Sequence, residues 1–233
     1  AVEKKVRGRR QVLLVPNGVD TDRFRPDPEA GAAVRAELGI GGDDLVVTVA
    51  GRLLPWKGQH VFLDAAAQVA AREPRARFLL VGGTICSGEE GYARGLREKA
   101  SALGISDRVV FSGHRKDMPA VFSASDIVVH CSLESEPFGR VVAEAMAVGR
   151  AVVATRSGGV ADVYEDGISG LGHQPGDVAG LAGAILRLAG DPGLREALSR
   201  AGVERAGALM SPKASAAALQ AVLGRLGELT GRR

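Results

Sequence analysis

The chain has 233 residues, and its 45% hydrophobic content excludes a disordered chain and suits one globular domain or two small ones. Only 4% of its residues are aromatic, so the core must consist mainly of Val, Leu and Ala. Its 32 glycines are roughly twice ordinary usage, and because they follow no G-x-y period they exclude a collagen-like chain and predict many tight turns. The formal charge of +3 comes from the two ends: residues 1–10 carry +4 and Arg232 and Arg233 carry +2, which leaves −3 over residues 11–231 and argues against a basic surface for nucleic acid.

The first predicted elements are a strand over residues 12–15, a turn-rich bend over 16–20 and a short helix over 31–39. From residue 45 onward, nearly continuous apolar runs alternate with stretches that have helical spacing. Such runs are typical of strands that are buried on both faces of a parallel sheet. The predicted strands cover residues 45–51, 77–82, 109–113, 127–132 and 151–156, and the helices that follow them at the C-terminal end cover 177–189, 194–209 and 212–229.

This alternation predicts an α/β fold with a Rossmann-like, doubly wound parallel sheet and C-terminal helices. Gly51, Gly82 and Gly113 each end a predicted strand, where such sheets bind ligands. We expect a basic N-terminal segment (1–10), a Rossmann-like domain (11–190) and C-terminal helices (191–233).

The two cysteines, Cys86 and Cys131, form no CxxC pair and indicate reduced thiols in a cytoplasmic protein. The sequence has no long uninterrupted apolar run and no signal-peptide pattern at its start. It begins with Ala1, which allows a processed start or a fragment.

The loop over residues 51–58 (GRLLPWKG) contains two cations that suit a diphosphate. Arg52 can grip oxygens through two parallel bonds, and Lys57 supplies a point charge. It is no Walker loop, because Lys57 precedes Gly58 instead of following a glycine and preceding Ser or Thr. Two solvated surface cations remain the alternative.

The stretch over residues 136–147 (EPFGRVVAEAMA) predicts a helix with Pro137 as its first residue and Gly139 open to a ligand. The start of such a helix can hold a phosphate. Glu136 would then lie at the mouth of the sheet, and Glu144 about two turns into the helix in an apolar run. Burying the Glu144 carboxylate requires a hydrogen-bond partner, which could be a ribose diol or an arginine, unless the residue lies at an exposed edge.

Glu136 and Glu144, separated by seven residues around PFG, resemble the E-x7-E motif of retaining glycosyltransferases. VFSGH (110–114), SDIVV (125–129) and TRSGG (155–159), together with the 51–58 loop, resemble the C-terminal, donor-binding half of family 4 glycosyltransferases of GT-B fold. PNGVD (16–20) is similar to the segment that enters this half. The resemblance covers about residues 12–190.

This resemblance implies a role for each matching residue. Arg52 and Lys57 would hold the donor diphosphate, and Glu136 would contact the transferred sugar rather than act as a nucleophile. Glu144 would bind the ribose. The residues expected to bind the donor are Gly51, Gly113, His114, Arg115, Phe138, Gly139 and Glu144, and those expected to be catalytic are Arg52, Lys57 and Glu136.

The expected substrate is a nucleotide-sugar, with UDP as the first choice of nucleotide and GDP as the next, and the anomeric configuration would be retained. No cofactor and no metal are expected. Asp20 and Asp22 superficially match a DxD metal motif, but they belong to the 16–20 turn and are interpreted as structural. In the family, a separate N-terminal half binds the acceptor, and it is missing here. The isolated chain should therefore transfer sugar poorly, and any membrane association would come from that half.

Two other functions stay open. A Rossmann oxidoreductase that binds NAD(P) fits the βαβ pattern, although no G-x-G-x-x-G follows a strand. A non-enzymatic nucleotide- or anion-binding module could use the basic ends to bind nucleic acid or an anionic membrane. His130, at the end of a predicted strand, is interpreted as a packing residue or one that bonds to the backbone.

Overall fold

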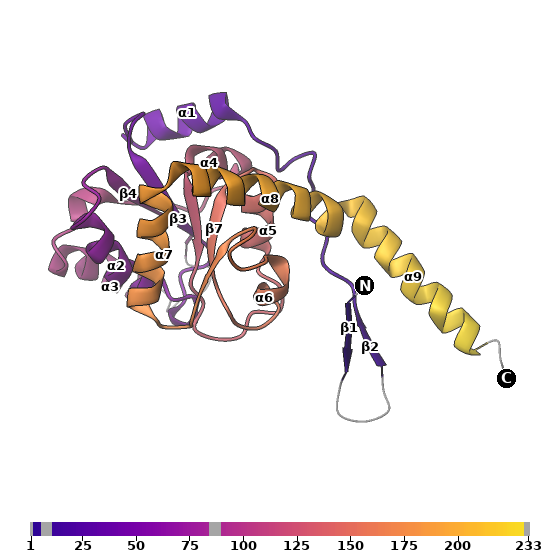
Figure 1. Cartoon of the computed structure of the whole chain (residues 1–233). Coiled ribbons are helices and arrows are strands. Elements are labelled where there is room, and N and C mark those ends of the chain that lie inside the picture. The colour runs from indigo at the N-terminus through magenta and orange to yellow at the C-terminus, as the bar shows by residue number, and fades with distance from the viewer. Residues whose placement is uncertain (1, 6–10, 84–89, 231–233) are drawn as a thin grey trace.

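A six-stranded parallel sheet forms the centre of the molecule, with strand order β5-β4-β3-β6-β7-β8. The computed structural model describes residues 2–5, 11–83 and 90–230 (Figure 1). The sheet confirms the predicted α/β class. Its strands are β3 (Leu45–Ala50), β4 (Ala76–Val81), β5 (Val109–Gly113), β6 (Ile127–His130), β7 (Ala151–Thr155) and β8 (Leu171–His173).

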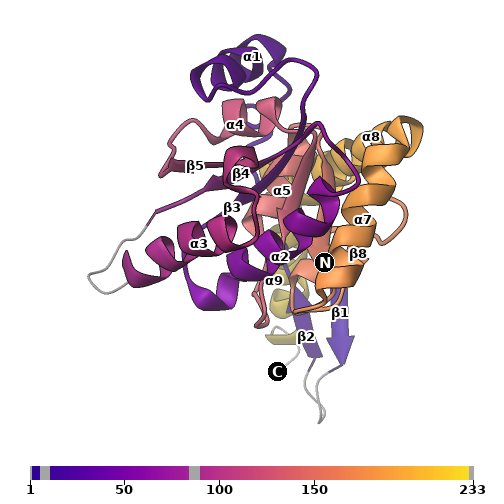
Figure 2. The ribbon, with the colours of Figure 1, turned by 90° about the vertical axis from the view of Figure 1, so that its left-hand side faces the viewer.

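Helices cover both faces of this sheet. In Figure 2 the helices α2, α3 and α7 lie in front of the sheet, and α5 lies behind it. The helix α8 contacts both layers, because its Leu198 packs in the core beneath α2 and α7, and its Ala206 packs in the core on the side of α5. The helices that surround the sheet are α1 (Pro28–Glu37), α2 (Gln59–Ala70), α3 (Glu90–Ala102), α4 (Met118–Ala124), α5 (Arg140–Ala147), α6 (Val160–Val163), α7 (Val178–Gly190) and α8 (Pro192–Met210).

The central strands are buried on both faces, as their apolar runs predict. Successive side chains of β3 alternate between the two layers: Val47 and Val49 pack beneath α2, whereas Val46 packs against the opposite layer. Thr48 is the polar residue of this strand, and its hydroxyl lies 2.6 Å from that of Ser125. The buried polar group is thereby satisfied.

The helices at the C-terminal end match their predicted ranges closely, and α1 begins three residues earlier than expected. Local caps set these starts: the side chains of Asp27, Asp177 and Asp191 accept hydrogen bonds from backbone N–H groups in the first turns of α1, α7 and α8. Pro28 follows the Asp27 cap as the first helical residue, so the helix begins before residue 31, where the sequence predicted its start.

An antiparallel hairpin and a long helix extend away from this body (Figure 1). The hairpin pairs β1 (Val2–Lys5) with β2 (Gln11–Leu14), so the predicted boundary after residue 10 falls between its two strands. The helix is α9 (Pro212–Thr230). The backbone N–H of Val19 donates to the Met210 carbonyl over 2.6 Å and joins the incoming segment to the end of α8. Across the described ranges, no helix combines the length and apolar character needed to span a membrane.

Candidate functional site

The site lies where the direction of the chain through the sheet reverses. From β3 the chain proceeds outward to β4 and β5, then returns to the other side of β3 to form β6, β7 and β8. The carboxyl ends of β3 and β6 are therefore neighbours, and the chain leaves them in opposite directions. Such a place is called the topological switch point, and it is where open α/β sheets bind ligands. The loops over residues 51–58 and 131–139 meet at this point.

The 51–58 loop is docked onto the end of β6 by its backbone. Gly58 has a φ of 73°, and a Cβ there would come within 2.0 Å of the Cys131 carbonyl oxygen, so only glycine fits. Leu133 N–H donates to the Trp56 carbonyl over 2.7 Å. The Lys57 ammonium lies 4.3 Å from the centre of the Trp56 ring. These contacts hold Lys57 at the junction of the two loops.

Lys57 and Glu136, both predicted to be catalytic, form an ion pair with 2.7 Å between Nζ and Oε2. The Glu136 Oε2 atom also lies 2.7 Å from His130 Nε2 and accepts from the Ser132 hydroxyl over 3.1 Å. Burial opposes ionisation of Glu136, but His130 and Lys57 outweigh it and lower its pKa to about 2. The carboxylate is therefore ionised, and the alternative of a solvated surface cation is wrong for Lys57.

The loop after β7 holds the backbone of Glu136. Gly159 N–H donates to the Glu136 carbonyl over 2.9 Å, and a Cβ on Gly159 would lie 1.8 Å from the Pro137 carbonyl oxygen. Gly158, with a φ of 62°, approaches the same segment. The two glycines of TRSGG thus allow the loop after β7 to contact the loop after β6.

The expectation that Pro137 begins the following helix is wrong, because α5 begins at Arg140. Gly139 caps it in the left-handed region, with a φ of 81°, and a Cβ there would approach Val160 Cγ2 to 2.7 Å. The contact of Pro137 with Gly159 and the turn at Gly139 delay the helix. Glu144 therefore lies about one turn into α5, not two.

Glu144 is buried, with 8% of its surface exposed, and its Oε1 accepts from Arg140 Nη2 over 2.9 Å. Burial raises the pKa of Glu144, although Arg140 opposes this effect. An arginine partner, one of the two hydrogen-bond partners considered for this carboxylate, is thus present. It is an exposed one, since the Arg140 side chain is 73% exposed.

A cavity of about 580 Å³ opens beside the ends of β3 and β4 and includes five of the predicted site residues. Arg115 is among them, but its guanidinium already pairs with Glu37 and Asp117, and these bonds raise its pKa. The lining residues are Ala50, Gly51, Arg52, Val81, Gly82, Gly83, His114, Arg115, Met118, Val141 and Glu144. Gly113 lies at the adjacent end of β5.

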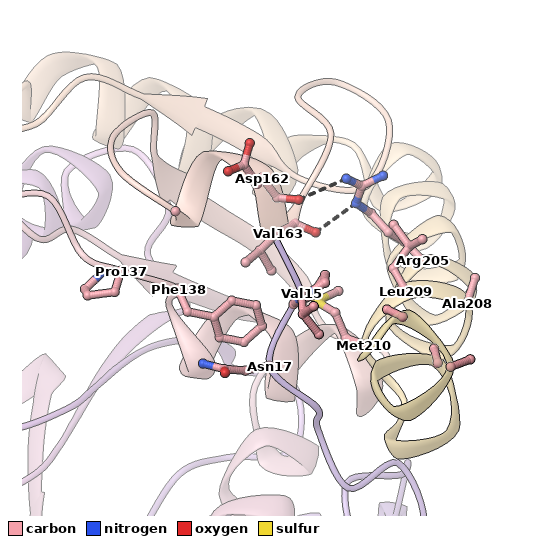
Figure 3. Close-up of a pocket in the computed structure, with 15 residues that line it drawn as sticks. Val15, Asn17, Pro137, Phe138, Asp162, Val163, Arg205, Ala208, Leu209 and Met210 are labelled. Atoms are coloured by element: carbon pink, nitrogen blue, oxygen red, sulfur yellow. Dashed lines mark hydrogen bonds between the residues drawn. The ribbon is translucent and has the colours of Figure 1, made fainter. Parts of the chain in front are cut away.

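Phe138 lies elsewhere, in a second cavity of about 790 Å³ between the 137–138 segment and the junction of α8 with α9. Figure 3 shows Pro137 and Phe138 on one side and Leu209 and Met210 on the other. Arg205 closes one end by donating to two backbone carbonyls of α6. The structure therefore does not bring the Phe138 side chain into the cavity that contains Glu144.

Residues 20–22 form a turn in which Asp20 Oδ1 accepts from the N–H groups of Asp22 and Arg23, which confirms the structural interpretation of this DxD sequence. Within the described ranges, no group of three or more His, Cys, Asp or Glu side chains is placed to hold a metal ion. Cys131 is free and buried, and Cys86 lies outside the described residues.

Three polar residues at this site were not predicted: His130, Ser132 and Thr155. The interpretation of His130 as a packing or backbone-bonded residue is wrong, because its side chain joins Glu136 to Thr155. One signal was available in the sequence: a histidine closes the otherwise apolar strand IVVH at the ligand-binding edge.

The structure combines a parallel sheet, an ion pair at its switch point and an adjacent cavity lined by Arg52, His114 and Glu144, which is an arrangement typical of α/β ligand-binding domains. Residues 32–205 match the family Glycosyl transferases group 1, and the chain belongs to this family. This membership favours a transferase over the NAD(P)-dependent alternative.

Two curated relatives illustrate the match. The D-inositol 3-phosphate glycosyltransferase of Saccharomonospora viridis is 39% identical over 84% of this chain and 46% of its own length. The GDP-mannose-dependent α-(1-6)-phosphatidylinositol monomannoside mannosyltransferase of Mycolicibacterium smegmatis is 36% identical over 81% of this chain and 50% of its own. The chain thus spans about half the length of the curated relatives it matches.

The fold is also that of solved GT-B glycosyltransferases. The crystal structure of Anabaena HepE in complex with UDP and glucose superimposes with a TM-score of 0.82 at 33% identity, covering 91% of this chain and 55% of HepE. The matches confirm the predicted fold class and the resemblance to the C-terminal domain of a GT-B enzyme.

Proposed function

We propose that this chain is the donor-binding domain of a retaining glycosyltransferase of family 4 and that it binds a nucleotide-sugar, with UDP preferred to GDP. The observation that carries the proposal is the Lys57–Glu136 pair at the switch point, beside the cavity lined by Arg52 and Glu144. The UDP bound by HepE and the GDP-mannose named for the mycobacterial relative support these two nucleotides.

In this proposal the diphosphate binds across the 51–58 loop. Arg52 and Lys57 offset the negative charge that develops on the leaving nucleotide, which is the electrostatic task that a metal performs elsewhere, so no metal or cofactor takes part. The Glu144 carboxylate accepts hydrogen bonds from the ribose hydroxyls, and Arg140 can swing outward because it is mostly exposed.

Glu136 contacts the donor sugar and does not attack it. Its three contacts with Lys57, His130 and Ser132 all use Oε2, so Oε1 is the oxygen that accepts from sugar hydroxyls. A carboxylate with a pKa of about 2 is a weak nucleophile but a good hydrogen-bond acceptor. The acceptor site belongs to an N-terminal half, and the enzyme works in the cytoplasm.

Calorimetry tests the proposal with UDP, GDP and ADP and their sugar conjugates. We expect the chain to bind UDP or GDP and the matching conjugate, and to transfer sugar to a simple acceptor poorly or not at all. A fluorescence titration with NADPH serves as the control for the oxidoreductase alternative. Binding of NADPH without binding of any of the three nucleotides would overturn the proposal, and rapid turnover by this chain alone would refute the need for a second half.

A further inference from the structure

His130, the last residue of β6, contacts the loop that follows it and the neighbouring strand β7 through its two ring nitrogens. Its Nε2 lies 2.7 Å from Glu136 Oε2 and 3.1 Å from the Ser132 hydroxyl, and its Nδ1 lies 2.8 Å from the Thr155 hydroxyl on β7. The residue is buried, with 7% of its surface exposed. A histidine that only filled space between β6 and β7 would need none of these contacts.

The charge of Glu136 decides which nitrogen carries the proton. An ionised carboxylate can only accept hydrogen bonds, so His130 Nε2 must donate to it. In the neutral imidazole, Nδ1 is then the acceptor, and the Thr155 hydroxyl donates to it. For a neutral His130, the arrangement therefore specifies the Nε2–H tautomer.

Lys57 has two competing partners once a diphosphate is present. Its ammonium now pairs with Glu136, and in the proposed function it must also neutralise phosphate oxygens. As Lys57 shares its charge, His130 and Ser132 remain as the donors that fix the carboxylate. Both are shorter side chains with fewer rotatable bonds than lysine, so we expect their contacts with Glu136 to persist when a ligand binds.

We propose that His130 is a positioning residue for the donor sugar: supported by Thr155, it holds Glu136 Oε2 so that Oε1 faces the sugar hydroxyls. This inference rests on the proposed function. It separates the part of the site that holds the sugar from the part that holds the nucleotide. Loss of His130 should therefore weaken binding of a nucleotide-sugar more than binding of the nucleotide alone.

Two measurements on the full chain test this role. Long-range ¹H–¹⁵N NMR reads the His130 tautomer without any ligand. Calorimetry with UDP and UDP-glucose, or the GDP pair if GDP binds more tightly, then compares wild type with His130→Leu, His130→Gln and Thr155→Val. His60→Leu is the matched control, because His60 contacts Tyr92 on the outer helices and not the site.

We expect the Nε2–H tautomer in the wild type and a loss of about tenfold in His130→Leu for the conjugate, against less than about twofold for the nucleotide. His130→Gln keeps an N–H donor near the Nε2 position and should restore most of this loss, and Thr155→Val should show a smaller one. The His60→Leu control should leave the ratio of the two affinities unchanged.

An Nδ1–H tautomer in the wild type would overturn the inference, and so would an unchanged ratio of affinities in His130→Leu. If His130→Leu does not fold, His130→Gln and Thr155→Val decide by the same ratio. A wild type that shows the Nε2–H tautomer but binds no nucleotide would support the contact with Glu136 and contradict the proposed function, so the two failures are distinguishable.

Discussion

Lys57 and Glu136 stand 79 positions apart in the chain, yet Lys57 Nζ lies 2.7 Å from Glu136 Oε2 at the switch point of the sheet. Both side chains are largely shielded from solvent, with 20% and 17% exposed. The pair is stronger than a surface ion pair because screening by water is limited and because His130 and Ser132 satisfy the same carboxylate. In the proposed function, the cation and the anion that contact the donor are thus already aligned before it binds.

Lys57→Ala should weaken binding of UDP by about tenfold or more, because a charge-assisted bond to the diphosphate is lost. Binding of uridine, which has no phosphate, should change little. Calorimetry measures both. Lys99→Ala is the matched control, since it removes another short lysine–carboxylate pair, with Asp64, away from the site. Equal losses for UDP and uridine would contradict a phosphate role.

Glu144→Ala distinguishes a ribose contact from a merely structural pair with Arg140. If Glu144 binds ribose, its removal should lower nucleotide affinity about tenfold, while Arg140→Ala leaves the affinity within about twofold. An i,i+4 ion pair on a helix contributes only about 0.3–0.5 kcal/mol, so both variants should fold. Calorimetry and thermal unfolding provide the readout. If Glu144→Ala and Arg140→Ala lose similarly small amounts of stability and nucleotide affinity stays unchanged, then Glu144 serves only to pair with Arg140.

Gly139→Ala should destabilise the protein by about 1–3 kcal/mol, because φ is 81° and the new Cβ would meet Val160. Gly207→Ala, in the exposed part of α8 with nothing within 4 Å of its Cβ position, should instead stabilise by about 0.5–1 kcal/mol. Urea unfolding compares the two. A neutral Gly139→Ala variant would show that the left-handed cap is not required.

The stability of the folded state should depend on Glu136 at acid pH. Its folded pKa of about 2 lies below the ordinary value of 4.5, so the ionised carboxylate stabilises the fold above about pH 4.5. That stabilisation, at most about 3 kcal/mol, is lost as pH falls from about 4.5 to about 2. The difference in unfolding free energy between wild type and Glu136→Gln should therefore shrink across this window.

Urea unfolding at pH 7, 5, 4 and 3 measures this difference. Glu134→Gln, which changes an exposed residue of the same loop, provides the control. A difference that stays constant down to pH 3 would show that Glu136 is not held in its ionised form by His130 and Lys57.

Cys131 should be unreactive in the folded protein. Burial raises the pKa of its thiol to about 12, and its Sγ lies 3.3 Å from the Gly58 carbonyl oxygen. In a Cys86→Ser variant, a thiol reagent such as dithionitrobenzoate should react only after denaturant is added. Immediate release of one equivalent of thionitrobenzoate would reveal that the end of β6 opens.

Local pattern predicted the strands that are buried on both faces, because a continuous apolar run has few other stable places in a fold. The run IVVH became β6 and AVVAT became β7 on this basis. The pattern missed β8, whose three residues include Gly172 and His173, because a short strand at the edge of a sheet needs no apolar run.

The motifs placed Glu136, Lys57 and Glu144 near the carboxyl edge of the sheet, but their partners depend on strand order. Strand order brings β3 beside β6 and β6 beside β7, and only then do His130 and Thr155 touch. Spacing along the chain carries no information about such neighbours.

By itself, then, the sequence determined the class of fold, the loops that carry charge and the composition of the site, since periodicity and residue type are local properties. Tertiary structure alone decided that α5 begins at Arg140 and that Glu136 is held by His130. It also placed Phe138 in a different cavity from Glu144. The physical reason is steric. At Gly58, Gly139 and Gly159 another part of the chain comes so close that a Cβ would clash, and these close contacts fix how the loops cross.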